Sequence, residues 1–408
     1  MSMPEPEAPQ GARGLPARIG VFVRGPLTPI LVLNFCMSAG LGMVWTILAV
    51  YISSMGATAA MTGLVMASFG GARLFVSIPA GALSERLGRA QVMLGGLLMM
   101  VVGSIASTVA GNVGLLAFTL LLQGIGSAAF ATSAMASVAD ISGPEERIRN
   151  MAAFQIASMA GVSIGPGVGG IIAGLFGLAA PFWLQGGMAA LGLLALRRVF
   201  RQTKRDGSAS RTLTRPRYGR LLASLAGPAL MSYSVQFMNI ACNWTIIPLI
   251  ATKVLGLGMG TVGTLLTAGA LTNFLILPVT PRLAARLGRR PLILAGSALN
   301  LCALAVVAAF PSLPALVICA VLVGVATGLS LPPVNASAAD AAPAGQMGAA
   351  MGIVRTTNDL AILTSPILVG FLISNTSLGY DAGLAGAAAV VIVTTTLFAL
   401  LRSTPRAG

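Results

Sequence analysis

The sequence contains very little charge and no histidine. Of its 408 residues only 9% are charged, against about 25% in ordinary soluble domains, whereas 56% are hydrophobic. A soluble core cannot enclose that much apolar surface, so the composition excludes an ordinary globular protein. The absence of histidine also removes the commonest metal ligand and proton shuttle of proteins.

Reactive and nucleotide-binding motifs are missing as well. The four cysteines lie in apolar runs and form neither a disulfide framework nor a metal-binding spacing: Cys36, Cys242, Cys302 and Cys319. No Gly-x-x-x-x-Gly-Lys-(Ser/Thr) loop occurs, and no nucleophile stands in a recognisable pattern with a base. We therefore expect no metal, no cofactor, no use of ATP and no enzymatic activity.

Long apolar runs dominate what is present. Residues 30–50, 92–110 and 384–401 are examples, each near the ~20 residues needed to cross a hydrocarbon layer. Lipid offers backbone groups no hydrogen-bond partners, and the runs lack the alternation of a barrel, so they must be helices. The sequence predicts an all-α membrane protein with twelve transmembrane helices, at 29–53, 59–83, 91–110, 113–140, 150–175, 178–196, 221–251, 258–281, 291–310, 315–340, 347–373 and 383–402.

The basic residues gather on one side of this helix map. By predicted loop, 22 of the 25 Lys and Arg residues lie on one side, nine of them in the segment 197–220. The positive-inside rule makes that side the cytoplasm, with both termini there. The rule also accounts for the net charge of +15 without a nucleic-acid partner, although the central linker could attract acidic lipid. The polar first 25 residues indicate no signal peptide.

The chain repeats at an offset of 200 residues. The clearest block is 83–89 against 283–289, where five of seven positions are identical. Because both copies of this basic loop must be cytoplasmic, each half has an even number of helices, and six plus six fits the length. We predict two six-helix bundles related by a pseudo-two-fold axis along the membrane normal. The expected order is a cytoplasmic tail (1–25), the first bundle (26–196), a basic cytoplasmic linker (197–220), the second bundle (221–402) and a second tail (403–408).

The loop at 81–89 carries a family resemblance. Its sequence, Gly-Ala-Leu-Ser-Glu-Arg-Leu-Gly-Arg, resembles the signature Gly-x-Leu-(Ala/Ser)-Asp-Arg-x-Gly-Arg between helices two and three of the major facilitator superfamily. In that family the loop latches the two halves at the cytoplasmic face. The resemblance assigns this role to Gly81, Glu85, Arg86, Gly88 and Arg89. The second copy has Ala285 at the acidic position, so the latch is expected to be one-sided.

A second motif resembles the fifth helix of the family's proton-coupled exporters, Gly-x-x-x-Gly-Pro-x-x-Gly-Gly. It is formed here by Gly161, Gly165, Pro166, Gly169 and Gly170. A generic small-residue packing face is the alternative, because such spacing is common in membranes. A fourth-helix motif is incomplete: Gln123-Gly-Ile-Gly matches, but Leu120 replaces the family's functional Arg.

Three ionisable residues fall inside predicted helices: Arg73, Arg355 and Asp359. Such residues are costly in a membrane and are functional candidates by default. Arg355 and Asp359 can pair at i,i+4, in the weaker orientation, and a purely structural pair is the alternative. Arg73 could bind backbone carbonyls, Asp359 across the interface, or an anionic substrate. We predict that the three form the proton-coupling or substrate site, because Asp359 lies about 18 Å along a helix that crosses a ~30 Å core.

Further polar and aromatic residues are candidates for lining a cavity. They are Asn34, Trp45, Gln123, Gln155, Gln236, Asn239, Asn243, Trp244 and Asn335. Taken singly, each could equally be a packing residue or an interface anchor. Asp140 and Asp340, at the ends of helices four and ten, are expected to pair with the basic loops.

These observations predict a secondary transporter that alternates access by rocking one bundle against the other. The leading hypothesis is a proton-coupled exporter, an antiporter of small organic molecules or drugs, acting as a monomer in the lipid bilayer of a bacterial inner membrane. Two membrane arginines against one aspartate favour an organic-anion carrier as the alternative. A non-transporting receptor on the same scaffold is a third hypothesis, and flux measurements would separate it from a transporter.

Overall fold

The structure is a computed structural model that describes residues 27–143, 146–203, 218–342 and 347–401, and these ranges are helical and contain no strand. Eleven segments within them are long and apolar enough to cross a membrane, and α7 (Ala180–Thr203) is a further long helix outside that set. The predicted all-α architecture is therefore confirmed.

The first bundle contains α2 (Thr28–Ser54), α3 (Ala59–Leu87), α4 (Arg89–Thr108), α5 (Val113–Ile141), α6 (Arg147–Phe176) and α7 (Ala180–Thr203). Local chemistry sets several boundaries. The side chains of Thr58 and Asn112 accept hydrogen bonds from the backbone N–H groups of Met61 and Leu115, which caps α3 and α5. Gly88 has a φ of +98°, which a residue with a side chain rarely adopts, and it turns the chain from α3 into α4.

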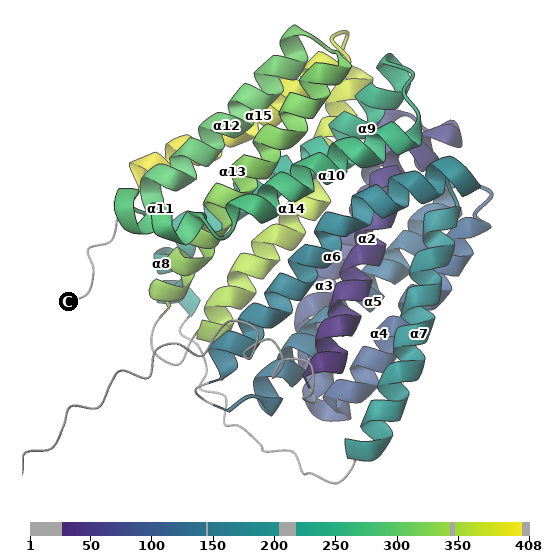
Figure 1. Cartoon of the computed structure of the whole chain (residues 1–408), viewed down its shortest axis with the longest axis vertical. Helices are drawn as coiled ribbons and strands as arrows, with labels where there is room; N and C mark the ends of the chain where they lie inside the picture. Colours follow the sequence, from purple (N-terminus) through teal and green to yellow (C-terminus); the bar gives the residue numbers. More distant parts are fainter. Residues whose placement is uncertain (1–26, 144–145, 204–217, 343–346, 402–408) are drawn as a thin grey trace, which may run out of the picture.

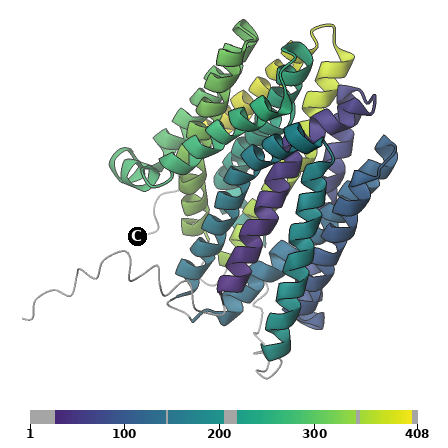
Figure 2. The ribbon, with the colours of Figure 1, turned by 45° about the vertical axis from the view of Figure 1, so that its right-hand side comes forward.

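The second bundle begins with one long helix that changes its winding. It comprises α8 (Tyr218–Ile240), a π-helical segment η1 (Ala241–Ile246), α9 (Ile247–Leu249) and a second π segment η2 (Ile250–Val254). The remaining helices are α10 (Met259–Ile276), α11 (Thr280–Leu287), α12 (Arg289–Ala309), α13 (Leu313–Asp340), α14 (Met347–Asn375) and α15 (Tyr380–Leu400). In Figures 1 and 2 the purple-to-teal helices of the first bundle lie on one side and the green-to-yellow helices on the other.

Three predicted helices differ from the observed ones. The helix expected at 258–281 is interrupted between α10 and α11, because Pro278 lacks an N–H and its ring clashes with the preceding turn. The helix expected at 221–251 continues to Val254 through two π segments. The helix expected at 178–196 extends to Thr203, into the predicted linker. The rest of that linker, like both predicted tails, lies largely outside the described residues.

Two helix crossings close the interface between the bundles. They join α3 to α14 and α6 to α10. Gly63 of α3 lies against the backbone of Pro366 and close to Gly370 in α14, and its repeat counterpart Gly263 lies against Pro166 and Gly170. A methyl group at Gly63 or Gly170 would overlap backbone atoms of the other bundle. The same small residues thus build both crossings at an offset of 200, which is the pseudo-two-fold relation in atomic terms.

The two ends of the molecule differ in charge. We call the end with the turns at Gly88 and Gly288 the basic end, and the other the opposite end. At the basic end Arg89 Nε lies 3.1 Å from Asp140 Oδ2, and Arg289 pairs with Asp340 through its Nη1 atom. The expected pairing of both aspartates with the basic loops is confirmed. The crossing at Gly63 and Pro366 lies toward the opposite end, so the bundles are held together there in this conformation.

Candidate transport site

A buried ion pair joins the two bundles at mid-helix. Arg73 Nε of α3 lies 2.9 Å from Asp359 Oδ1 of α14, and Asp359 is 1% exposed. The other ion pairs found between described residues each lie within one bundle. Asp359 is one of the three partners considered for Arg73, and the structure shows this contact.

Two neighbouring serine hydroxyls form hydrogen bonds with this ion pair. Arg73 Nη1 donates to Ser127 Oγ of α5 at 2.6 Å, and Ser77 Oγ lies 3.3 Å from Asp359 Oδ2. The Arg73 guanidinium also sits over the Phe69 ring, 5.8 Å from its centroid. Sequence reasoning missed Ser77 and Ser127. Of the two, only Ser77 could have been recognised from the sequence, because it follows Arg73 by one helical turn and so lies on the same face of the helix.

Arg355 is not paired with Asp359 in the way expected from their spacing. Its Nη1 instead lies 3.8 Å from Met135 Sδ of α5. Residues at i and i+4 are neighbours on a helix, so the spacing alone would allow the pair. In the structure the carboxylate of Asp359 is engaged by Arg73 of the other bundle instead.

Two tryptophans stack across the bundle interface. The rings of Trp45 in α2 and Trp244 in η1 have centroids 4.2 Å apart and planes inclined by 19°. Beside Trp244 lies a cavity of about 60 Å³. Its polar lining comes from both bundles and contains no charged residue: Thr46, Ser163, Asn239, Asn243 and Asn273. The Oδ1 atoms of Asn243 and Asn273 are buried and receive no hydrogen bond. Sequence reasoning named Asn239 and Asn243 but missed Asn273, Ser163 and Thr46.

The remaining predicted cavity residues are dispersed. Asn34 donates to the Phe154 carbonyl at 2.9 Å, and Gln123 donates to Ser107 Oγ at 3.0 Å, so both amides are engaged inside the first bundle. Gln155 is exposed, and Gln236 and Asn335 are partly buried on α8 and α13. We leave these five out of the proposed site.

The glycine motif of α6 faces in two directions. Side chains at Gly161, Gly165 or Gly169 would collide with the backbone of α2, which crosses α6 closely within the first bundle. Pro166 and Gly170 face α10 of the other bundle. The motif therefore provides close helix packing on both faces of α6.

The loop expected to act as a latch lies at the basic end. Glu85 is 49% exposed in its side chain and lies 3.9 Å from Arg89, while Arg86 is exposed. Gly81 packs near Thr132, and Gly88 makes the turn. The contacts of Glu85 and Arg89 described here remain within the first bundle, so the latch stays a prediction for another conformation.

We expect Glu85→Gln to shift the balance of the two open states without unfolding the protein, because the second copy of the loop lacks an acid that could replace Glu85. Accessibility of single cysteines placed on both faces measures this shift. Glu146→Gln is the matched control, since Glu146 also pairs locally, with Arg149 at 2.6 Å. Unchanged accessibility and transport in Glu85→Gln would contradict the latch.

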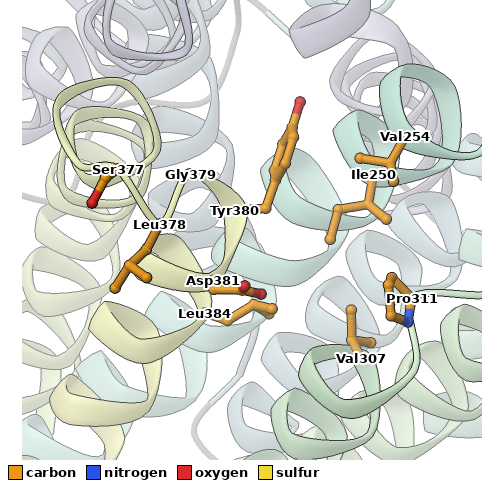
Figure 3. A pocket seen from close by; sticks show the side chains of 10 residues that line it. All are labelled: Ile250, Val254, Val307, Pro311, Ser377, Leu378, Gly379, Tyr380, Asp381 and Leu384. Carbon is orange, nitrogen blue, oxygen red and sulfur yellow. The ribbon is translucent and has the colours of Figure 1, made fainter.

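A larger cavity, of about 280 Å³, lies away from these residues at the opposite end. Figure 3 shows its walls, with Asp381 and Leu384 near Val307 and Pro311, and Tyr380 beside Ile250 and Val254. All of its lining residues belong to the second bundle. A relative movement of the bundles would therefore not expose it alternately to two sides, and we do not assign the transport site to it.

Comparison with known proteins identifies the family. A model described as the Major Facilitator Superfamily matches residues 30–227 and 229–408. The chain is 28% identical over 161 residues to Quinolone resistance protein NorA of Staphylococcus aureus, covering 40% of this chain and 40% of that protein. It is 29% identical over 157 residues to Multidrug resistance protein 2 of Bacillus subtilis, covering 38% and 39%. The match thus spans about 40% of the length of these relatives.

Solved structures agree with the fold. A bacterial homolog of the human lysosomal transporter Spinster, in an inward-facing and unoccupied conformation, gives a TM-score of 0.72 at 15% identity, covering 96% of this chain and 100% of that one. The nucleoside transporter NupG gives 0.73 at 13% identity, covering 93% and 100%. The family match over nearly the whole chain establishes that the protein belongs to the major facilitator superfamily, and these likenesses show the same fold.

Proposed function

We propose that this chain is a proton-driven exporter of small organic molecules, working as a monomer by alternating access in a bacterial inner membrane. The observation that carries the proposal is the buried Arg73–Asp359 pair, which joins the bundles and contains the one carboxylate of the site. The names of the relatives, a quinolone and a multidrug resistance protein, support organic drugs as substrates.

Asp359 is suited to couple protons to movement. Its ion pair bridges α3 and α14, so protonation removes an attraction that holds the bundles together. Rocking of the bundles would expose this depth alternately to the two sides, as coupling an ion to a substrate requires. In this mechanism Asp359 takes up a proton while the pair is open and releases it when Arg73 returns.

The cavity beside Trp244 is the proposed contact for the substrate. An indole ring and two amide oxygens that lack partners, those of Asn243 and Asn273, suit a flat apolar molecule with uncharged hydrogen-bond donors. At about 60 Å³ the cavity holds only a fragment of such a molecule, so a whole substrate requires the bundles to separate further.

Transport by everted membrane vesicles tests the proposed function. A fluorescent quinolone should accumulate in vesicles that contain the protein when a pH gradient, acidic inside, is imposed, and the accumulation should collapse when nigericin dissipates the gradient. Vesicles without the protein give the baseline. Accumulation that needs no ion gradient, or none above baseline with a panel of drugs, would contradict a proton-driven drug exporter.

The basic end is expected to face the cytoplasm. Cysteines placed at Ser208, which lies outside the described residues, and at Ser377, in the turn before α15, report the two sides in a cysteine-free background. An impermeant thiol reagent applied to intact cells should label position 377 at once and position 208 only after permeabilisation. Labelling at 208 without labelling at 377 would reverse the assignment.

A further inference from the structure

The membrane-spanning part of the bundle interface contains one more positive charge than negative charge. Arg73 and Arg355 contribute two cations, and Asp359 contributes one anion. Each oxygen of Asp359 already accepts a hydrogen bond, Oδ1 from Arg73 and Oδ2 from Ser77, and the charge of Asp359 balances that of Arg73. Burying an unpaired charge is costly in a protein, and more so in a membrane. The charge of Arg355 therefore needs a counter-charge that the surrounding described residues do not supply.

The donors of Arg355 have poor acceptors. Its Nε is buried and has no hydrogen-bond partner, although a guanidinium offers five N–H donors. The contact of Nη1 is to a thioether sulfur, Met135 Sδ, which is a weak acceptor. Native proteins leave few buried donors unsatisfied, so this point of the interface is suited to an acceptor.

A second unused donor lies on the same neighbouring helix. The hydroxyl of Thr132 in α5 is buried without a partner, one turn before Met135. Arg355 itself is only partly buried, so part of its side chain can be reached. It precedes Asp359 in α14, which starts at the basic end, so an ion from that end meets Arg355 before the Arg73–Asp359 pair.

We propose that Arg355 binds a small monovalent anion between the bundles, either a halide ion or the carboxylate group of an organic acid. Both are compact acceptors that satisfy guanidinium and hydroxyl donors. A single negative charge balances the excess, whereas a phosphate dianion would reverse it. The proposal goes beyond drug export and does not depend on the direction or driving force of transport.

Anion binding to the purified protein in detergent tests this site. The protein is prepared in gluconate buffer, and chloride replaces gluconate at constant ionic strength. We expect saturable binding of radioactive chloride and a thermal midpoint that rises with chloride. Arg355→Gln should lower the affinity at least about tenfold, because it removes charge-assisted hydrogen bonds. Arg290→Gln is the matched control, since Arg290 donates to the Ala399 carbonyl and should leave binding unchanged.

Benzoate distinguishes the two sources of the anion. If benzoate displaces chloride, the site accepts carboxylates; if chloride binds and benzoate does not displace it, the site is a halide site, and both results support the proposal. Should Arg355→Gln fail to fold, Arg355→Lys keeps the charge without the planar fork and should weaken binding about tenfold. The absence of saturable chloride and benzoate binding, or undiminished binding in the Arg355 variants, would overturn the proposal whether or not the protein exports drugs.

Discussion

Asp359→Asn is expected to fold and bind substrate but to lose all accumulation driven by a proton gradient. Asparagine matches the shape of aspartate and can still accept a hydrogen bond from Arg73, but it cannot take up or release a proton. Uptake in proteoliposomes with an imposed pH gradient should fall to that of empty liposomes. Exchange of substrate without a gradient should persist, because it requires binding and rocking but no proton.

The control for this variant is Asp381→Asn. Asp381 is exposed in the first turn of α15, at the opposite end and away from the interface, so its loss should leave gradient-driven uptake intact. If Asp359→Asn instead concentrates substrate in response to a proton gradient, Asp359 is not the coupling residue and the proposed mechanism fails.

Neutralising one partner of the buried pair should destabilise the protein more than neutralising both. Arg73→Gln leaves a buried carboxylate and Asp359→Asn leaves a buried guanidinium, and breaking a buried pair in this way typically costs about 3–5 kcal/mol. In the double variant no lone charge remains from the pair. Its thermal midpoint should therefore fall by less than the sum of the decreases in the two single variants. Thermal unfolding of the four purified proteins in one detergent measures this coupling.

The pair between Arg89 and Asp140 is the matched control. It has a similar separation, 3.1 Å, but side-chain exposures of 26% and 51%. Exposed pairs contribute only about 0–1 kcal/mol, so Arg89→Gln and Asp140→Asn should have small and nearly additive effects. Additive effects at Arg73 and Asp359 as well would show that these side chains do not interact in the folded protein.

The helices and their repeat could be predicted from the sequence because both depend on local information. Apolar length indicates a spanning helix, and the block 83–89 and 283–289 gives the offset of the two halves. The interruption at Pro278 was missed because helix-breaking residues such as Pro166 and Pro366 also lie inside unbroken membrane helices. The π turns of η1 and η2 carry no residue pattern that marks them.

The partners of the membrane charges could not be predicted in the same way. Spacing favoured Arg355 as the partner of Asp359, because the two are neighbours along one helix, and offered Arg73 only as one of several possibilities. The partner in the structure, Arg73, is 286 residues away and becomes a neighbour only when α3 packs on α14. Asn273 was overlooked for the same reason, since its role depends on which face of α10 meets the other bundle.

The second π segment has a consequence for movement. Trp45 and Trp244 are 199 residues apart, one short of the repeat, but a π turn holds about one residue more than an α turn. Because η2 lies between Trp244 and Gly263, the counterpart of Gly63, its extra residue accounts for the difference in spacing, and the repeat then places the two tryptophans at equivalent positions in the two bundles. Equivalent residues that touch lie close to the pseudo-two-fold axis, where the two bundles meet. Separation of the bundles at this depth must therefore part the two indoles, and it would uncover the ring of Trp244 beside the cavity.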